Sequence, residues 1–232
     1  MEDTICAVST APGAGGIAVI RISGPEAIAI CNTIFVPRTA GKGLLSQKAY
    51  TLRYGSIRRG EELIDEVLIA LFRAPHSFTG EDTVEITCHG SVYIQQQIMQ
   101  LLIERGCRSA LPGEYTQRAF MNGKMDLSQA EAVADLIAST SAGQHRLALN
   151  QMRGDFSHEL KNLREQLLHI TSLMELELDF SDHEELEFAD RSELSTLAAH
   201  IETVISRLAN SFSVGNAIKN GIPVALIGET NA

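Results

Sequence analysis

Residues 77–90 read SFTGEDTVEITCHG and contain the clearest strand signal in the chain. Within residues 83–87 two apolar side chains, Val84 and Ile86, alternate with polar ones, as in a strand that buries one face. The residues before this strand are rich in turn formers, so the chain is expected to reverse direction there. The stretch therefore predicts a sheet with one buried face and one polar face.

The segments on either side have a similar character up to about residue 110. Short runs rich in β-branched residues are separated by glycines and polar turns, and two apolar runs predict helices. Pro25 fits the first turn of one helix, and Gly106 fits the C-cap of the other. Residues 1–120 are therefore expected to form one α+β domain. The expected strands cover residues 4–9, 17–22, 49–57 and 63–72, and the expected helices cover residues 26–35 and 91–105.

The pattern after residue 110 is helical, and residues 121–215 are assigned to a helical domain. A short helix is expected to end near Asn122 and Gly123. Apolar residues then recur in steps of three and four, which predicts one long helix over residues 140–178.

A second long helix is expected after the helix-start signature at Asp190. Two long amphipathic helices cannot bury their apolar faces alone, so they need each other and further helices. Gly215 and Gly221 are expected to frame a hinge into a final strand, and residues 216–232 are assigned to this linker and strand.

The composition limits the class of protein. Nineteen basic and 29 acidic residues give a net charge of 19 − 29 = −10, so the overall field does not favour DNA, RNA or anionic membranes. The sequence shows no signal peptide and no apolar run long enough to span a membrane. These features predict a reduced, soluble, cytoplasmic protein.

The four cysteines form no C-x-x-C pair. Cys6, Cys31 and Cys88 lie in apolar runs and are expected in the core, and the fourth is Cys107.

Two residues in the strand-rich part are candidates for ligand binding. Arg21, in the apolar strand VIRIS, could bind a carboxylate through its planar fork, although a solvent-facing arginine is the simpler reading. Glu85, on the polar face of its strand, could accept hydrogen bonds from the ring N–H and amino group of a heterocycle.

Two further candidates are less specific. Lys124 follows the expected short helix and could bind an anion, or it could satisfy carbonyl groups at the helix end. His89 could act as a general base, but the sequence shows no nucleophile with a defined partner.

Two glycine-containing stretches resemble nucleotide-binding motifs. Residues 13–18 fit G-x-G-x-x-G/A, but that motif opens a helix, whereas these residues open a predicted strand. Residues 222–232, IPVALIGETNA, fit the strand and the first positions of a P-loop, G-x-x-x-x-G-K-[ST], up to its fifth position.

Four stretches together resemble a known family. GGIAVIRISG, SFTGEDTVEITCHG, PGEYTQRAFMNGKMDLSQAEAVADLI and the final GETNA occur in this order and cover essentially the whole chain. They are similar to the family of tRNA modification GTPases called MnmE or TrmE. The resemblance implies an N-terminal folate-binding domain like that of aminomethyltransferases, followed by a helical domain into which a Ras-like G domain is inserted.

The resemblance also implies a function. Members of the family act with the flavoprotein MnmG on C5 of the wobble uridine, U34, of tRNA, and take a one-carbon unit from a tetrahydrofolate, either 5-formyl or 5,10-methylene. On this chain the folate-contacting positions are Arg21, Glu85 and Lys124. The folate-binding domain also implies a homodimer.

The end of the chain matches the start of the family's P-loop. Gly228 begins that loop, and Asn231 is the position that binds GTP and potassium in the complete protein. The lysine and the magnesium-binding hydroxyl residue are absent from the 232 residues, so no catalytic residue is assigned and no GTP hydrolysis is expected from them. A stand-alone folate-dependent aminomethyl or formyl transferase and a non-enzymatic dimerisation scaffold are the alternatives.

Overall fold

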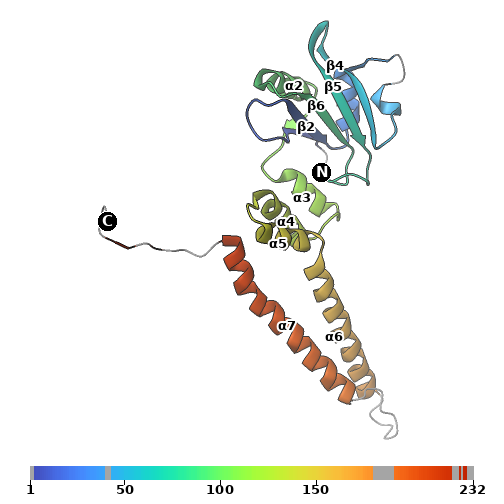
Figure 1. Ribbon diagram of the computed structural model, residues 1–232. Coiled ribbons are helices and arrows are strands. Elements are labelled where there is room, and N and C mark those ends of the chain that lie inside the picture. The colour runs from blue at the N-terminus through green and yellow to red at the C-terminus, as the bar shows by residue number, and fades with distance from the viewer. Residues whose placement is uncertain (1–2, 40–42, 180–190, 221–224, 226, 229–232) are drawn as a thin grey trace. The chain divides into compact units, whose positions relative to one another are not determined.

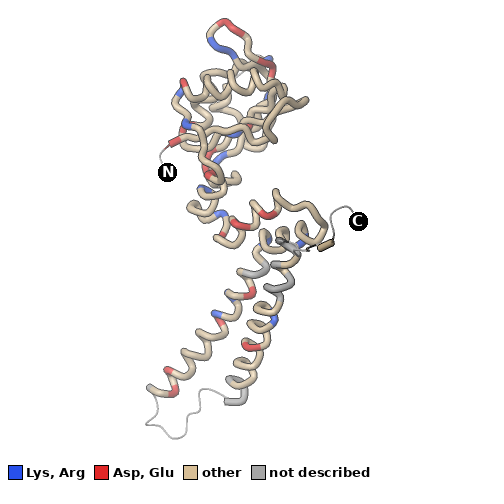
Figure 2. The backbone as a smooth tube through the Cα atoms, turned by 90° about the vertical axis from the view of Figure 1, so that its left-hand side faces the viewer, with Lys and Arg blue, Asp and Glu red and all other residues tan. Residues whose placement is uncertain are grey.

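The computed structural model describes residues 3–39, 43–179, 191–220, 225, 227 and 228 (Figure 1). The chain divides into two compact units, Met1–Met125 and Asp126–Ala232, which are described separately. Basic and acidic residues are interspersed along the described backbone and do not gather in one basic stretch (Figure 2). The first unit mixes strands and helices and the second is helical, which confirms the predicted fold class.

The described residues of the first unit form a seven-stranded sheet in the order β3-β4-β5-β6-β2-β1-β7. Every neighbouring pair is antiparallel except β1 and β7, which run parallel. The five predicted strands are all present; β3 and β7 were not predicted because each is very short. The strands are β1 (Ile5–Val8), β2 (Ile17–Ser23), β3 (Phe35–Pro37), β4 (Thr51–Arg59), β5 (Glu62–Phe72), β6 (Thr83–His89) and β7 (Arg108–Ser109).

One face of this sheet forms the core. Successive side chains of a strand point to opposite faces, and on β6 Val84, Ile86 and Cys88 are buried while Glu85 and Thr87 are half-buried. The buried face packs against helices α1 (Ala27–Ile34) and α2 (Val92–Glu104). All four cysteines are buried and free, which confirms the prediction for three of them.

The opposite face of the sheet, the open face, is not the one covered by α1 and α2, and at β2 the ring of Tyr115, from the short helix that begins at Glu114, lies 5.7 Å from Arg21 Cζ. Because Arg21 pairs in register with Glu85, and Glu85 with Ala70, these side chains share this open face. Apolar side chains farther along the same face are exposed, with Leu52 70% and Leu68 42% accessible. The remaining elements of the unit are the 3₁₀ turn η1 (Leu44–Ser46) and α3 (Glu114–Met121).

The second unit contains four helices within its described residues. A capping box joins Asp126 and Gln129 at the start of α4, and the Ser141 side chain caps α5. Gln129 Nε2 donates to the carbonyl of Met152 at 3.0 Å and Gln151 Nε2 to that of Ser128 at 3.1 Å, so α4 and α5 form a pair. The helices are α4 (Leu127–Ala138), α5 (Ala142–Met152), α6 (Asp155–Asp179) and α7 (Arg191–Asn220).

The structure corrects two predictions for this unit. The single long helix expected over residues 140–178 is two helices, because the backbone at Gly154 takes a φ of +83° and ends α5. Gly215, expected at a hinge, lies inside α7. The helix-start position Asp190 lies outside the described residues.

The two long helices bury little apolar surface against each other. Leu163 of α6 packs against Ile201 and Val204 of α7, whereas Leu167 and Ile205 are 49% and 51% accessible. This agrees with the expectation that such helices need further partners. No helix in the described part of the chain has the length and apolar character needed to cross a membrane.

Candidate functional site

Arg21 and Glu85 form an ion pair on the open face of the sheet. They lie opposite each other on β2 and β6. Arg21 Nε donates to Glu85 Oε1 at 2.9 Å, and Arg21 Nη2 lies 2.7 Å from the same oxygen in the ion pair. No donor from the described residues reaches the second oxygen, Oε2, and the two side chains are 28% and 25% accessible. Arg21 is therefore neither a core residue nor a free surface arginine, and Glu85 keeps one oxygen for another donor.

Two aromatic rings flank the Arg21 guanidinium. The ring centroids of Phe78 and Tyr115 each lie 5.7 Å from Arg21 Cζ, within the range of a cation–π contact. Phe78 comes from the turn between β5 and β6, and Tyr115 comes from α3. The Tyr115 hydroxyl donates to the backbone carbonyl of Arg21 at 2.6 Å, and burial raises the pKa of Tyr115 above its usual range. The phenol thus remains a donor and holds α3 against β2.

Lys124, which follows α3 in the chain, packs against the turn that contains Phe78. Its Nζ donates to the carbonyl of Pro75 at 3.0 Å, and its Cγ lies 3.2 Å from where a Cβ on Gly80 would be. The side chain therefore binds the turn and does not satisfy the carbonyls of α3, so that alternative is wrong. Arg21 and Glu85 contact each other directly. Lys124 contacts neither of them by a hydrogen bond, but it binds the turn at residues 73–82, whose Phe78 ring lies beside Arg21.

A buried arginine fixes this turn and α3 to the rest of the unit. The Arg118 side chain has no accessible surface. Its Nη2 donates to Asp3 Oδ1 at 2.7 Å and to Glu114 Oε1 at 3.1 Å, and its Nη1 donates to Glu81 Oε1 at 3.2 Å. Glu81 also accepts from the hydroxyl of Ser23 at 2.8 Å. One guanidinium thereby connects α3, the turn before β6 and the first described residue of the chain.

Glu114 is held in its charged form by the same network. Hydrogen bonds from Arg108, against the opposing effect of burial, lower the pKa of Glu114 to about 2, and the backbone N–H of Leu111 and Arg118 add to the shift. Arg108 also binds Asp3 at 2.7 Å. Acids and bases are thus paired at the start of α3.

His89 is oriented by a buried carboxylate that the sequence analysis did not identify. Its ring Nδ1 lies 2.7 Å from Asp65 Oδ1, and its backbone N–H donates to Asp65 Oδ2 at 2.8 Å. The His89 side chain is 69% accessible, so the pair presents Nε2 to solvent, as a general base requires. His89 lies four residues beyond Glu85 on β6, about 13 Å along the strand, and is therefore separate from the Arg21–Glu85 pair.

The glycines at residues 13–16 contact another glycine rather than opening a helix. The Gly15 N–H donates to the Gly90 carbonyl at 3.0 Å and the Gly90 N–H donates to the Gly16 carbonyl at 3.4 Å, and a Cβ on Gly90 would lie 2.3 Å from the Gly15 carbonyl oxygen. A dinucleotide fingerprint requires a helix at this point, and β2 follows instead.

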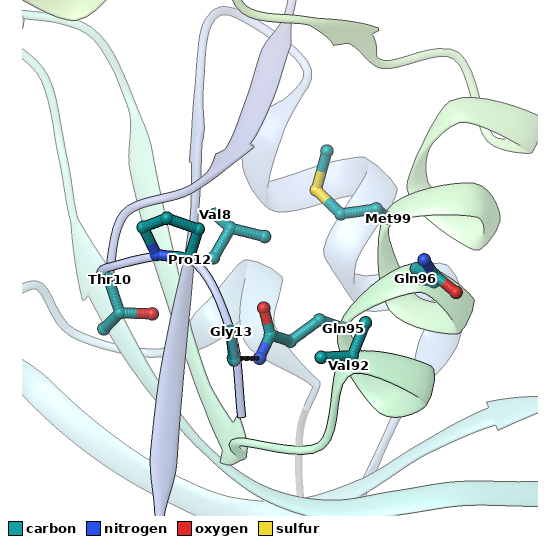
Figure 3. A pocket seen from close by; sticks show the side chains of 8 residues that line it. All are labelled: Val8, Thr10, Pro12, Gly13, Val92, Gln95, Gln96 and Met99. Carbon is teal, nitrogen blue, oxygen red and sulfur yellow. Dashed lines mark hydrogen bonds between the residues drawn. The ribbon is translucent and has the colours of Figure 1, made fainter. Parts of the chain in front are cut away.

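A pocket of about 420 Å³ lies beside this loop, where it meets α2 (Figure 3). Gln95 Nε2 donates to the carbonyl of Gly13 at 3.2 Å and so joins the two walls. The pocket is lined mainly by aliphatic groups and includes none of the predicted ligand-binding residues. Its lining residues are Val8, Thr10, Pro12, Gly13, Val92, Gln95, Gln96 and Met99.

The predicted P-loop start is described only at Gly228. Gly228, Ala225 and Ile227 are exposed residues outside any helix or strand, whereas the rest of the predicted last strand and Asn231 lie outside the described residues. Within the described ranges, no group of three or more His, Cys, Asp or Glu side chains is arranged to hold a metal ion.

The sequence analysis did not identify Phe78, Tyr115, Arg118 or Asp65. The i,i+4 spacing of Glu114 and Arg118 was the one local signal for the buried network. The contacts of the other residues join segments far apart in the sequence.

Comparisons with known proteins agree with this architecture. Residues 4–124 match the family model described as GTP-binding protein TrmE N-terminus, and residues 127–223 match the model of the MnmE helical domain. The tRNA modification GTPase MnmE of Parabacteroides distasonis is 80% identical over 99% of this chain and 50% of that protein. Those of Bacteroides fragilis and Porphyromonas gingivalis are 71% and 56% identical over 100% and 99% of this chain and 49% and 48% of those proteins.

The chain thus spans about half the length of the curated relatives it matches. The two matched family models occur in the same order as the two compact units of the structure. The identities, together with these two matches, show that the chain belongs to the family of tRNA modification GTPases called MnmE or TrmE.

Proposed function

We propose that this chain is the folate-binding, dimerising portion of a GTPase that modifies tRNA. In the complete protein, a tetrahydrofolate supplies a one-carbon unit for C5 of the wobble uridine, U34, and the flavoprotein MnmG is the partner. The substrate class follows from the relatives, which are named as tRNA modification GTPases. The folate assignment follows from the family resemblance and from the chemistry of the open face.

The free oxygen of Glu85 is the observation that carries the folate proposal. Arg21 occupies Oε1 and keeps the carboxylate fixed, while Oε2 has no donor among the described residues. The ring N–H and exocyclic amino group of a pterin are two neighbouring donors that such a carboxylate accepts. A carboxylate that is already oriented loses little conformational entropy on binding, which favours recognition.

Lys124 is the proposed contact for the anionic end of the folate. Its ammonium group donates to the Pro75 carbonyl, its partner among the described residues, and so retains donors for a carboxylate of the glutamate tail. The proposed contacts are the same for 5-formyl- and 5,10-methylene-tetrahydrofolate. Glu85 would bind the pterin and Lys124 the glutamate tail, and neither would contact the one-carbon unit.

The proposed homodimer uses the open face of the sheet. Apolar side chains at successive positions of β3, β4 and β5 are exposed there, which is costly for a monomer and typical of an interface. Burying this surface against a second copy would remove the cost. The residues are Val36, Leu52, Tyr54 and Leu68, which are 48%, 70%, 44% and 42% accessible.

The remaining parts of the proposal concern the complete protein in the cytoplasm. Gly228 begins a P-loop for GTP and magnesium, and Asn231 contributes to a potassium site. The P-loop lysine and hydroxyl residue are not among the 232 residues, and folate binding is the role proposed for the residues given.

Calorimetric titration with 5-formyltetrahydrofolate tests the central proposal. The parent chain is expected to bind, and Glu85→Ala to weaken binding about a hundredfold or more, because it removes hydrogen bonds to a charged group. Glu62→Ala, at an exposed position at the start of β5, is the matched control and should bind like the parent. Absence of binding in a folded, dimeric parent would favour the scaffold alternative.

A further inference from the structure

We propose that Phe78 is the residue that receives the flat pterin ring and so makes the site selective for conjugated heterocycles. This inference rests on the proposed folate function and adds a specificity residue to it. Neither the sequence pattern nor the family resemblance assigned Phe78 a role.

Phe78 is an exposed aromatic ring on the turn at residues 73–82, with polar residues on both sides of it in the sequence. It is 39% accessible and belongs to neither buried cluster of the described residues. Its position is not explained by the core, since its ring faces the Arg21 guanidinium on the open face. Exposed aromatic surface at the edge of a polar site is typical of a group that packs against a ligand.

The backbone that carries Phe78 is held on both sides. Ser77 Oγ donates to the carbonyl of Glu81 at 2.6 Å, and Asn122 Nδ2 donates to the carbonyl of Thr79 at 2.8 Å. The Glu81 side chain is bound by Arg118. The residues before and after Phe78 are therefore fixed, and its ring is presented without an entropic penalty from the loop.

Phe78 lies close enough to Glu85 for one ligand ring to contact both. Glu85 Oε1 lies 2.7 Å from Arg21 Nη2, and the Phe78 centroid lies 5.7 Å from Arg21 Cζ, so both adjoin one guanidinium. A heterocycle that donates to the free Oε2 of Glu85 thus lies beside the Phe78 ring. Aromatic faces stack on flat heterocycles, and a cation at the edge adds to this attraction.

Tyr115, the second ring, has a different role. Its hydroxyl is already bound to the Arg21 carbonyl at 2.6 Å, and the residue joins α3 to β2. It is a positioning residue, with its ring 5.7 Å from the Arg21 guanidinium carbon. Phe78 has no polar atom and can contribute only its ring surface.

The absence of tryptophan from the chain makes a direct test possible. Phe78→Trp places one tryptophan, which can be excited apart from the tyrosines, at the proposed contact and preserves an aromatic face. Titration with 5-formyltetrahydrofolate should quench its emission, with an affinity near that of the parent. Tyr93→Trp, on α2 and 63% accessible, is the control for absorption by the ligand and should show the smaller change.

Phe78→Leu keeps an apolar side chain but removes the aromatic face. Its affinity for 5-formyltetrahydrofolate, measured by calorimetry, should fall about tenfold, the size of one stacking contact. A Leu variant that binds like the parent overturns the inference, whatever the tryptophan emission does, and leaves the folate proposal intact. A parent chain that does not bind refutes the folate proposal itself.

Discussion

Arg21 holds one oxygen of Glu85: its Nε donates to Oε1 at 2.9 Å and its Nη2 lies 2.7 Å from the same atom, while no donor from the described residues reaches Oε2. The pair therefore orients a carboxylate for a third group. Arg21→Lys retains the charge but loses the planar fork, so the orientation of Glu85 is lost. We expect folate affinity to fall about tenfold, with the free energy of unfolding changed by less than about 1 kcal/mol because the pair is partly exposed.

Calorimetry and urea unfolding of the Arg21→Lys variant separate these two effects. A variant that unfolds more easily and binds folate normally would show that the pair serves stability rather than recognition.

The buried Arg118 network should be the most sensitive feature of the first unit. Arg118→Met leaves the Glu114 and Glu81 carboxylates without their shared cation, and breaking such a pair costs about 3–5 kcal/mol. Urea denaturation measures this loss. Arg105→Met, at an exposed arginine just after α2, is the control and should change stability by less than about 0.5 kcal/mol. Equal stabilities for the two variants would contradict the assigned role.

The stability of the first unit should depend on acidic pH through Glu114. Its pKa is about 2 in the folded state against 4.5 normally. A carboxyl with a depressed pKa stabilises the fold above the unfolded-state pKa, and this contribution is lost as pH falls from about 4.5 toward 2. For a side chain this buried the full effect is about 3 kcal/mol. Unfolding free energies between pH 6 and 3 should decline less steeply in Glu114→Gln than in the parent.

The proposed dimer can be tested at the exposed apolar face. Leu68→Asp places a charge at the centre of that face and should shift the sedimentation of the protein from dimer to monomer. Ile103→Asp, on α2 and 46% accessible, is the control and should leave the dimer unchanged. Dissociation by the control rather than by Leu68→Asp would place the interface on the helical side.

Two glycines of the second unit should respond in opposite ways to alanine. Gly154 has a φ of +83°, so Gly154→Ala strains the backbone and should destabilise by about 1 kcal/mol or more. Gly215 lies inside α7, where a Cβ would meet only Leu147 Cδ2 at 3.8 Å, and Gly215→Ala should stabilise by about 0.5–1 kcal/mol. Thermal unfolding of the two variants gives the sign of each change.

Local patterns predicted the sheet and most helices because they arise within a few residues. The alternation in residues 83–87 reports which face of β6 is buried, and it placed Glu85 correctly on the other face. The break between α5 and α6 was missed because a periodic apolar pattern continues through Gly154, and one glycine costs a helix only about 1 kcal/mol.

The candidate site was predicted only in part, because most of it consists of contacts between distant segments. Arg21 and Glu85 are 64 residues apart, and Tyr115 reaches Arg21 across 94 residues. Nothing local distinguishes Phe78 from a core phenylalanine or Asp65 from a surface aspartate. The site depends on the sheet register, which brings Arg21 opposite Glu85 and which no local pattern specifies.

The contacts between Asp3 and Arg118 join the two ends of the first unit. The backbone carbonyl and the carboxylate of Asp3 both accept from this arginine, at 2.8 and 2.7 Å, so the beginning of the unit is tied to its last helix. That helix carries Tyr115, which touches the strand of Arg21. An affinity tag fused immediately before Asp3 would therefore be the wrong choice for binding measurements, whereas a tag placed after residue 220 leaves this closure intact.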